Sequence, residues 1–234
     1  MAASSGVAGS GSSIFDREAP RYDAWCDSPD GRLLFRAEVD AVRRLLVGLP
    51  TPWLEVGVGT GRFAEALGVS FGVDPARGAL HLARRRGIRV ALAQGEALPF
   101  PDRRFGAVLL IVTLCFAEPH GLLVEIRRVL SPAGGLIVAD ILRDSPWGHR
   151  YLRLKEADHP FYRHATFYGF EELEHLLAEA GLVTRRVSSA ITPASRRVSN
   201  CRAGVRRPAS GGVVCMRSGT GKVTFDFSCG GLFH

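Results

Sequence analysis

The middle of the chain alternates between short apolar runs and longer segments in which apolar residues recur at helical spacing. Short apolar runs that end at glycine or proline are typical of buried strands, and helical spacing is typical of amphipathic helices. Strands alternating with helices are in turn typical of an α/β fold with a doubly wound, mostly parallel sheet and helices on both faces. The pattern predicts strands at 53–59, 70–74, 88–95, 105–114 and 135–141. It predicts helices at 33–49, 61–68, 75–87, 120–130 and 170–181, with a turn at 131–135.

Two segments depart from this alternation. Residues 1–13 are small and polar, which predicts a disordered leader before a domain that spans 14–187. Within the domain the alternation lapses at 144–169, a stretch rich in aromatic residues and histidine. Because this stretch follows the last predicted strand of the alternation, we expect it to form a lid over the carboxyl ends of the strands.

Residues 188–234 form an atypical basic tail rich in Arg, Ser and Gly. Two apolar segments in it, 211–216 and 222–227, are candidates for a closing hairpin; the alternatives are a disordered tail and a shifted reading frame. Nine of the 30 Lys and Arg residues but only one of the 23 Asp and Glu residues lie at 183–234. The net charge of +7 therefore comes from the tail, and because the rest of the chain is near neutral, a nucleic-acid partner is not expected.

Composition and cysteine content are those of an ordinary globular domain. The chain has 234 residues, of which 46% are hydrophobic and 23% are charged. No apolar run approaches the roughly 20 residues of a membrane-spanning helix, and no secretory signal is recognisable, so we expect a cytoplasmic protein without a membrane anchor. The five cysteines are odd in number and include no C-x-x-C pair, so neither a disulfide framework nor a metal site is expected.

A glycine-rich loop follows the first predicted strand, in the sequence E-V-G-V-G-T-G at 55–61. Glycines let a ligand lie against bare backbone, and the helix that follows directs free N–H groups to the same place. Dinucleotide enzymes require G-x-G-x-x-G, which Arg62 interrupts, so an NAD or nucleotide-sugar enzyme is disfavoured. Asp74 ends the second strand, where its carboxylate can bind ribose hydroxyls or cap the helix expected to open at Pro75.

Four segments together resemble class I S-adenosylmethionine (SAM)-dependent methyltransferases, in the type 11 group that includes the ubiquinone and menaquinone C-methylases. The glycine loop resembles the first motif of this family, and F-D-R-E-A-P-R-Y-D-A-W at 15–25 resembles its opening segment. Q-G-E-A-L-P-F at 94–100 resembles its third motif, and the apolar strand that begins at Phe105 resembles the next. The resemblance implies a Rossmann-like fold with a seven-stranded sheet. Gly106 replaces an Asp that is usual in the family.

The resemblance also implies a set of cofactor contacts. Tyr22 would close over SAM, Asp74 would bind the ribose, and the amide oxygen of Gln94 would accept from the adenine amino group in place of the family's Asp. The N–H of Gly95 would meet an adenine ring nitrogen, and Ile111 would border the methionine portion. The implied cofactor-binding residues are Tyr22, Glu55, Gly57, Gly59, Gly61, Asp74, Pro75, Gln94, Gly95, Glu96 and Ile111.

The sequence predicts a methyltransferase that acts on a small molecule, without naming the acceptor. His159, His164 and Tyr162 in the expected lid are candidates for a general base, and the alternative is that these residues only pack the lid. A second hypothesis is a catalytically inactive SAM-binding protein with a regulatory or partner role. A nucleic-acid or protein methyltransferase is disfavoured by the neutral domain and by the absence of an N-P-P-Y-type motif.

Overall fold

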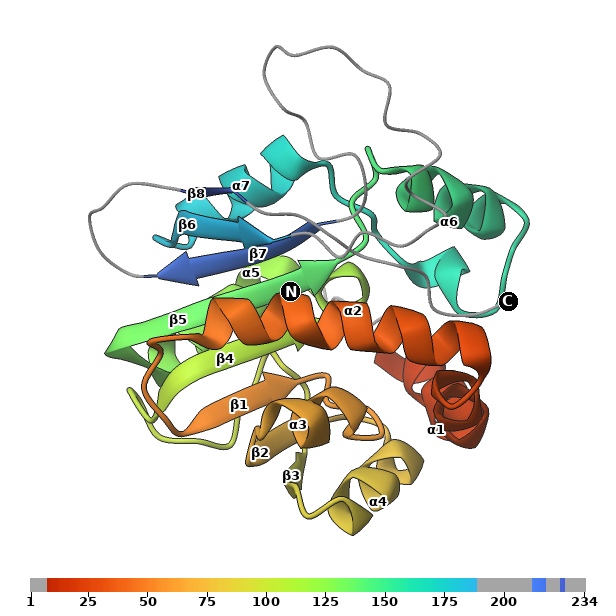
Figure 1. Cartoon of the computed structure of the whole chain (residues 1–234), viewed down its shortest axis with the longest axis horizontal. Coiled ribbons are helices and arrows are strands. Elements are labelled where there is room, and N and C mark those ends of the chain that lie inside the picture. The colour runs from red at the N-terminus through yellow and green to blue at the C-terminus, as the bar shows by residue number, and fades with distance from the viewer. Residues whose placement is uncertain (1–7, 189–211, 218–223, 226–234) are drawn as a thin grey trace, which may run out of the picture.

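The computed structural model describes residues 8–188, 212–217 and 224–225. One sheet runs through this part of the chain in the strand order β3-β2-β1-β4-β5-β7-β6-β8 (Figure 1). Its first five strands are mutually parallel, whereas β7 is antiparallel to both β5 and β6. The strands are β1 (Trp53–Val56), β2 (Phe71–Asp74), β3 (Arg89–Leu92), β4 (Phe105–Ile111), β5 (Leu130–Asp140), β6 (Val183–Ser188), β7 (Gly212–Arg217) and β8 (Thr224–Phe225).

The predicted α/β fold is confirmed, with one difference in the number of strands. Within the described residues the sheet has eight strands in place of the predicted seven, because the short strand β8 pairs with β6. The chain order reverses between β1 and β4, which makes that point of the sheet the place where α/β folds bind ligands. The helices are α1 (Ala8–Cys26), α2 (Pro29–Leu46), α3 (Arg62–Leu67), α4 (Arg77–Arg85), α5 (Pro119–Val129), α6 (Pro146–Glu156) and α7 (Phe170–Glu179), with 3-10 turns η1 (Leu114–Phe116) and η2 (Tyr162–His164).

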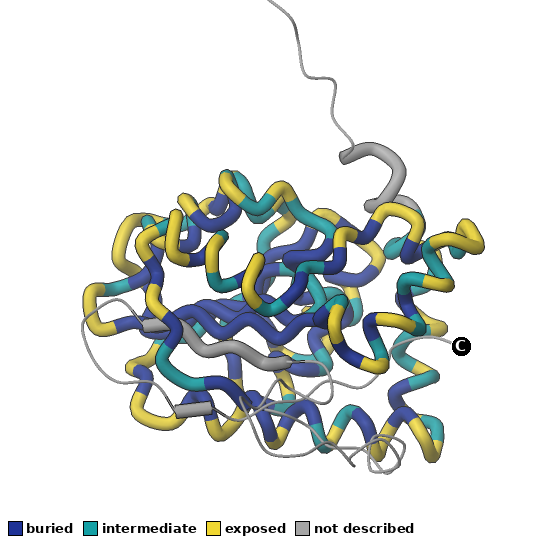
Figure 2. Tube along the Cα trace, turned by 90° about the horizontal axis from the view of Figure 1, so that it is seen from above, coloured by how far each residue is buried: buried dark blue, intermediate teal, exposed yellow. Residues whose placement is uncertain are grey.

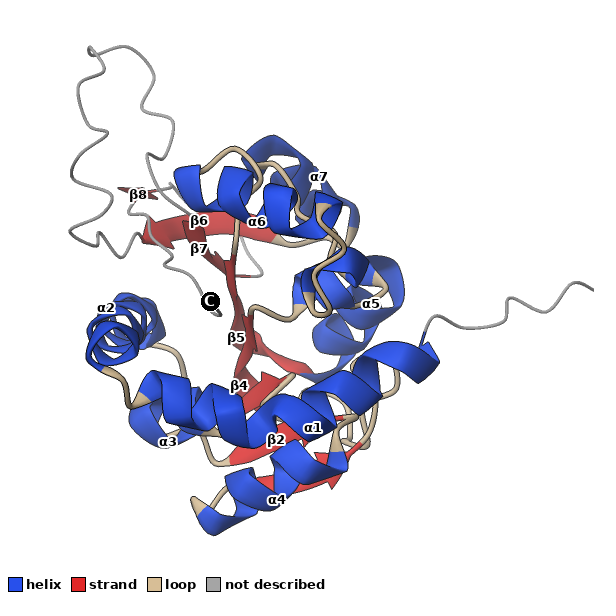
Figure 3. Ribbon diagram, turned by 90° about the vertical axis from the view of Figure 1, so that its right-hand side faces the viewer, coloured by secondary structure: helices blue, strands red, loops and turns tan. Residues whose placement is uncertain are grey.

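Helices cover both faces of the sheet (Figure 3), and the alternation of side chains along β4 explains why. Ala107 and Leu109 pack with α2, α3 and α4 on one face, whereas Val108 and Leu110 pack with α5 and α7 on the other. Every residue of β4 is buried, and Figure 2 shows the strands as the buried interior beneath exposed outer turns of the helices. None of the described helices is long and apolar enough to cross a membrane.

The N-terminal helix corrects one prediction. α1 begins at Ala8, so residues 8–13 are helical, and the predicted disordered leader is wrong for them. Adding residues to an existing helix costs far less than starting one, so the helix that contains the F-D-R-E-A segment extends back through small residues. Residues 1–7 lie outside the described residues.

Two element boundaries also differ from the predictions. The turn predicted at 131–135 lies inside β5, and a register shift between Phe105 and Ala107 of β4 accommodates it. α4 begins at Arg77, two residues after Pro75, because the Asp74 side chain accepts the Ala76 N–H and holds these residues in a turn.

The expected lid and the tail contain structure that the sequence pattern did not define. Residues 144–169 include α6, which begins after Ser145, whose hydroxyl caps it by accepting from the Gly148 N–H at 2.9 Å. The two candidate closing segments form β7 and β8, but not a hairpin. β7 pairs on both sides, with β5 and β6, so β8 takes the remaining edge of β6. The rest of the tail lies outside the described residues.

Gly106 has a structural reason for departing from the family's Asp. A Cβ atom at this position would lie 1.8 Å from the carbonyl oxygen of Pro50. The N–H of Gly106 donates to the carbonyl oxygen of Pro52 at 2.9 Å, so a backbone hydrogen bond also holds the two segments together. The close approach of two chain segments therefore requires a residue without a side chain.

Candidate functional site

The glycine loop after β1 lies at the point where the strand order reverses. Gly57 has a φ of 74°, and a Cβ there would lie 2.2 Å from Thr113 Oγ1, so the loop packs directly against the segment after β4. Gly59 has a φ of 51°, and no heavy atom would lie within 4 Å of a Cβ built on it. Gly61 is buried against Ala83 of α4. The loop therefore presents bare backbone with open space at Gly59.

Asp74 is held against this loop at the end of β2. Its Oδ2 accepts from the Gly59 N–H and its Oδ1 from the Ala76 N–H, each at 2.8 Å. The carboxyl is 8% exposed, and burial raises its pKa although both N–H groups act to lower it. Each oxygen has further acceptor capacity, so the carboxylate can still receive hydroxyl donors. Pro75, next to it, is exposed.

Glu55 on β1 is a buried carboxyl with an unsatisfied oxygen. It is 2% exposed, and its Oε2 has no hydrogen-bond partner within the described part of the chain. Burial and the nearby Asp74 carboxylate raise its pKa well above the ordinary value, against a hydrogen bond from the Ala64 backbone. Because an unsatisfied buried carboxyl is costly, a cation or hydrogen-bond donor placed beside it would stabilise the charged form.

Tyr22 of α1 lies beside this acidic interior. Burial raises the pKa of its phenol well above the usual range, with further contributions from Cys26, Glu38 and Glu55. Glu38, on α2, is 6% exposed. Glu38 and Glu55 both lie near Tyr22, and Glu55 lies near Asp74, so these buried carboxyl groups form a cluster in which a cationic ligand would favour the charged forms.

The segment after β3 is positioned by α5. Gln94 is exposed at the rim, whereas Gly95 is packed so that a Cβ would lie 2.6 Å from Leu122 Cδ1. The Glu96 carboxylate accepts from the Glu118 N–H at 3.0 Å, at the start of α5. Gln94 is therefore open to a ligand, whereas the Glu96 carboxylate has a structural partner.

The end of β4 brings a strained residue to the site. Ile111 is 8% exposed and packs on the α2 face of the sheet. The next residue, Val112, has a φ of 48°, which is rare for a β-branched side chain, and its N–H donates to the Ala139 carbonyl oxygen at 2.7 Å. Strain of this kind persists where the surrounding structure holds it and is frequent at functional sites.

The three candidate general bases occupy different environments. His159 is half-buried, its pKa is lowered by burial and by Arg21, and its Nδ1 accepts from the Phe161 N–H at 3.3 Å. The neutral ring therefore carries its proton on Nε2 and is a donor rather than a base in this arrangement. Tyr162 is 2% exposed and its pKa is raised by burial and by Tyr151. His164 is exposed and accepts from the Arg163 guanidinium at 3.1 Å, outside the buried cluster.

The cluster beneath the lid is aromatic and has one buried acid beside it. Tyr162 contacts Tyr151 at 4.6 Å between ring centroids. Asp140, at the end of β5, is 5% exposed and accepts from the backbone of Cys115 and Ile141. Asp140 and Glu38 were missed from the sequence because each is a single acid outside the motifs that point to the site. No group of three or more metal-ligating residues forms within the described ranges.

Comparison with known proteins defines the family. Residues 54–138 match the profile of the family described as "Methyltransferase domain". A solved SAM-dependent methyltransferase of Thermotoga maritima, described as a possible histamine N-methyltransferase, superposes with a TM-score of 0.75 and 32% identity. The match covers 88% of this chain and 99% of that one. The chain therefore belongs to the SAM-dependent methyltransferase family, and SAM is the cofactor that this family uses.

Two relatives without an assigned function are more similar in sequence. An uncharacterized protein of Methanocaldococcus jannaschii is 36% identical over 179 residues, which cover 76% of this chain and 85% of that protein. An uncharacterized protein of Mycobacterium tuberculosis is 50% identical over 178 residues, which cover 75% of this chain. The matched region spans 62% of the length of that second relative.

Proposed function

We propose that this protein is an enzyme that transfers the methyl group of SAM to a small-molecule acceptor. The observation that carries the proposal is the buried Glu55 carboxyl, whose Oε2 lacks a partner beside a bare glycine loop. SAM is a cation with an amino group, so it can supply both the charge and the hydrogen-bond donors that this carboxyl lacks. The fit of the site to the family's cofactor therefore rests on the chemistry of these residues as well as on the sequence motifs.

The remaining site residues suit the other parts of the cofactor. Asp74 would accept the ribose hydroxyls while keeping its bonds to Gly59 and Ala76. The exposed Gln94 would accept from the adenine amino group. Tyr22 would close the site from α1, and Ile111 would border the methionine end.

When bound, SAM supplies a methyl group that is already activated by its sulfonium. The protein must then bind the acceptor, align it with the methyl group and exclude water. The aromatic residues of the segment 144–169 and of α1 close the carboxyl end of the sheet and favour an acceptor with apolar surface. No catalytic base is assigned, because Nδ1 of His159 already accepts from the Phe161 N–H, the Tyr162 phenol stays protonated, and His164 lies at the surface.

Thermal unfolding with S-adenosylhomocysteine (SAH), with NADH as the control nucleotide, tests the cofactor. A hundredfold excess of SAH over its dissociation constant should stabilise the native state by about 2.7 kcal/mol, and NADH should have no effect. Glu55→Gln should weaken SAH binding about tenfold or more, since it removes the charge and keeps the shape. Glu171→Gln, an exposed change on α7, is the matched control. An unchanged Kd in Glu55→Gln would remove the argument from this carboxyl.

Turnover separates the two hypotheses about activity. Incubation with methyl-labelled SAM and a panel of small apolar acceptors should release SAH and label at least one acceptor. Binding of SAH without turnover on any acceptor would favour the SAM-binding regulatory or partner protein. Absence of SAH binding would overturn both hypotheses.

A further inference from the structure

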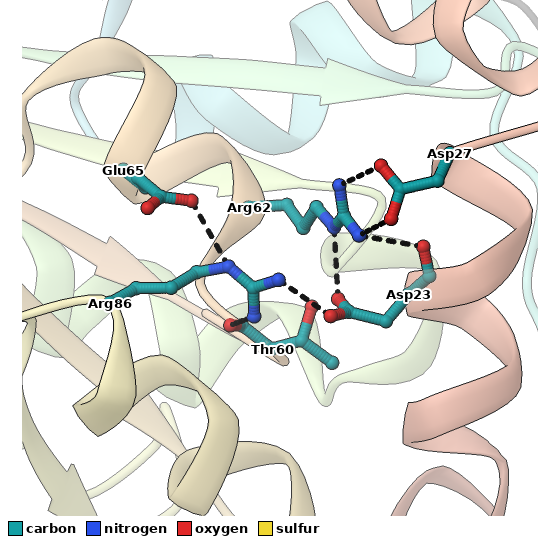
Figure 4. A network of polar contacts seen from close by, with 6 residues as sticks. All are labelled: Asp23, Asp27, Thr60, Arg62, Glu65 and Arg86. Atoms are coloured by element: carbon teal, nitrogen blue, oxygen red, sulfur yellow. Dashed lines mark hydrogen bonds and ion pairs between the residues drawn. The ribbon is translucent and has the colours of Figure 1, made fainter.

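A network of charged groups ties α1 to the glycine loop (Figure 4). Arg62, the first residue of α3, donates from Nε to Asp23 Oδ1 at 3.0 Å and from Nη2 to the Asp23 carbonyl oxygen at 2.7 Å. The same guanidinium donates to both carboxylate oxygens of Asp27, at 2.8 and 2.5 Å. Arg62 therefore binds two successive turns of α1 at once.

Arg86 reaches the same aspartate from the end of α4. Its Nη2 donates to Asp23 Oδ2 at 2.5 Å, and its Nε donates to Glu65 at 3.0 Å. Its Nη1 donates to the carbonyl oxygen of Thr60, inside the glycine loop, at 2.8 Å. Asp23 thus receives one guanidinium on each carboxylate oxygen, and one of these guanidinium groups also holds the loop.

The central ion pairs of the network are largely shielded from solvent. The side chains of Asp23, Arg62 and Arg86 are 17%, 15% and 17% exposed. Burial acts to raise the pKa of Asp23, but the two guanidinium groups lower it, so the carboxylate stays charged. Shielded charge-assisted hydrogen bonds of this kind are stronger than those of an exposed pair.

Asp23 and Tyr22 are neighbours on α1 with different roles. While Asp23 is bound by the two arginines, Tyr22 lies next to Glu55 and Glu38 in the acidic interior. Nearer the start of α1, Asp16 accepts from the Gly78 N–H at 2.6 Å, and the Phe15 ring packs on Phe116 at 5.2 Å between centroids. Figure 3 shows α1 lying across the end of the sheet, so a ligand on the glycine loop would be covered by it.

We propose that Asp23, Arg62 and Arg86 form an ionic latch that holds α1 closed over the cofactor and sets the rate at which the cofactor product leaves. The three are positioning residues, which act through Tyr22 and the loop and make no contact with the acceptor. The inference rests on the proposed function, since it assigns the regulation of that same site. Opening α1 must break both guanidinium contacts to Asp23 before the loop is exposed.

The dissociation rate of SAH tests the latch in the full chain. Asp23→Asn should raise this rate about tenfold or more, the effect expected from the loss of charge-assisted hydrogen bonds. Asp40→Asn is the matched control, since Asp40 pairs with Arg43 on the exposed face of α2. Added salt should raise the rate in the native chain and in the control more than in Asp23→Asn. Equal dissociation rates in all three proteins would overturn the proposal.

Amide hydrogen exchange without ligand separates this inference from the proposed function. Asp23→Asn and Arg86→Gln should each speed exchange in α1 while the core strands β1 and β4 stay protected, and the double variant should add little to either. Equal acceleration throughout the protein would mean a merely structural role and would overturn the latch. If the native chain does not bind SAH, the proposed function fails, and the exchange pattern still decides whether α1 is held by these ion pairs.

Discussion

Gly106 and Pro50 approach so closely that a Cβ on residue 106 would stand 1.8 Å from the carbonyl oxygen of Pro50. The contact joins the start of β4 to the segment that leads into β1, the two strands on either side of the reversal point. The spacing of these strands, and hence of the loops after them, depends on this contact. Packing in this chain requires a glycine at position 106. The absence of the family's Asp therefore does not mean that the site has lost a functional residue.

Gly106→Ala should therefore destabilise the fold. Accommodating the methyl group requires the backbone of one segment to move, which should lower the free energy of unfolding by about 3 kcal/mol or more. Urea unfolding measures this. Gly48→Ala is the control, since Gly48 has a φ of 80° but no heavy atom within 4 Å of the added Cβ, and it should cost about 1 kcal/mol. A loss no larger than that of the control would contradict the packing argument.

Arg128 should be irreplaceable by lysine. Its guanidinium donates to the carbonyl oxygens of Leu98 and Phe100 and to the carboxylates of Asp102 and Glu125, so it fastens the loop after β3 to α5. An ammonium group cannot span four acceptors, so Arg128→Lys should lower the free energy of unfolding by about 2 kcal/mol.

Hydrogen exchange at 94–100 gives a local measure of the same change. The loop should exchange faster in Arg128→Lys and remain protected in Arg85→Lys, an exposed substitution on α4. Unchanged exchange at 94–100 would show that the loop is held by the packing of Leu98 and Phe100 alone.

Asp140 should make stability fall as the pH rises through the weakly acidic range. Burial raises its pKa to about 6 in the folded protein, against a value of 3.8 for an ordinary aspartate. The unfolded chain therefore releases this proton at a lower pH than the folded protein does. The contribution of Asp140 to the free energy of unfolding is complete below pH 3.8 and is lost as the pH rises to about 6. Asp140→Asn should gain stability relative to the native chain by about 3 kcal/mol across this interval.

Urea unfolding across this pH interval measures the difference between the two proteins. The free energies of unfolding of the native chain and of Asp140→Asn should diverge as the pH rises. Parallel curves would contradict the assignment to Asp140. Asp30→Asn, at the exposed start of α2, is the control for removing one carboxyl group.

The core fold and the position of the candidate site follow from local sequence patterns. Fully apolar β4 and the glycine-rich end of β1 have strong local signatures, because burial on both faces and a tight turn each restrict residue type. The start of α6 also had a signal, in Ser145 followed by Pro146, but its aromatic residues obscured the helical spacing. Local pattern therefore locates the loops that make the site.

Contacts between distant residues left no such signature. Asp23 and Arg62 are 39 positions apart, and each looks like an ordinary charged surface residue in its own segment. Glu38 stands four positions from both Leu34 and Val42, on the buried face of α2, but this spacing does not show which residues of other elements face it. The electrostatics of the site depend on how α1 and α2 pack against the loop, which only the three-dimensional arrangement defines.

The position of β7 also has a consequence for the order of assembly during synthesis. β7 lies between β5 and β6, although it follows both in the chain. Until residues 212–217 have left the ribosome, β5 and β6 each present an unpaired edge, and open edges invite pairing with other chains. A nascent chain paused before residue 212 would already contain the complete glycine loop and its neighbouring strands, but its sheet would lack β7. We therefore expect the need for chaperones to be greatest before β7 is synthesised.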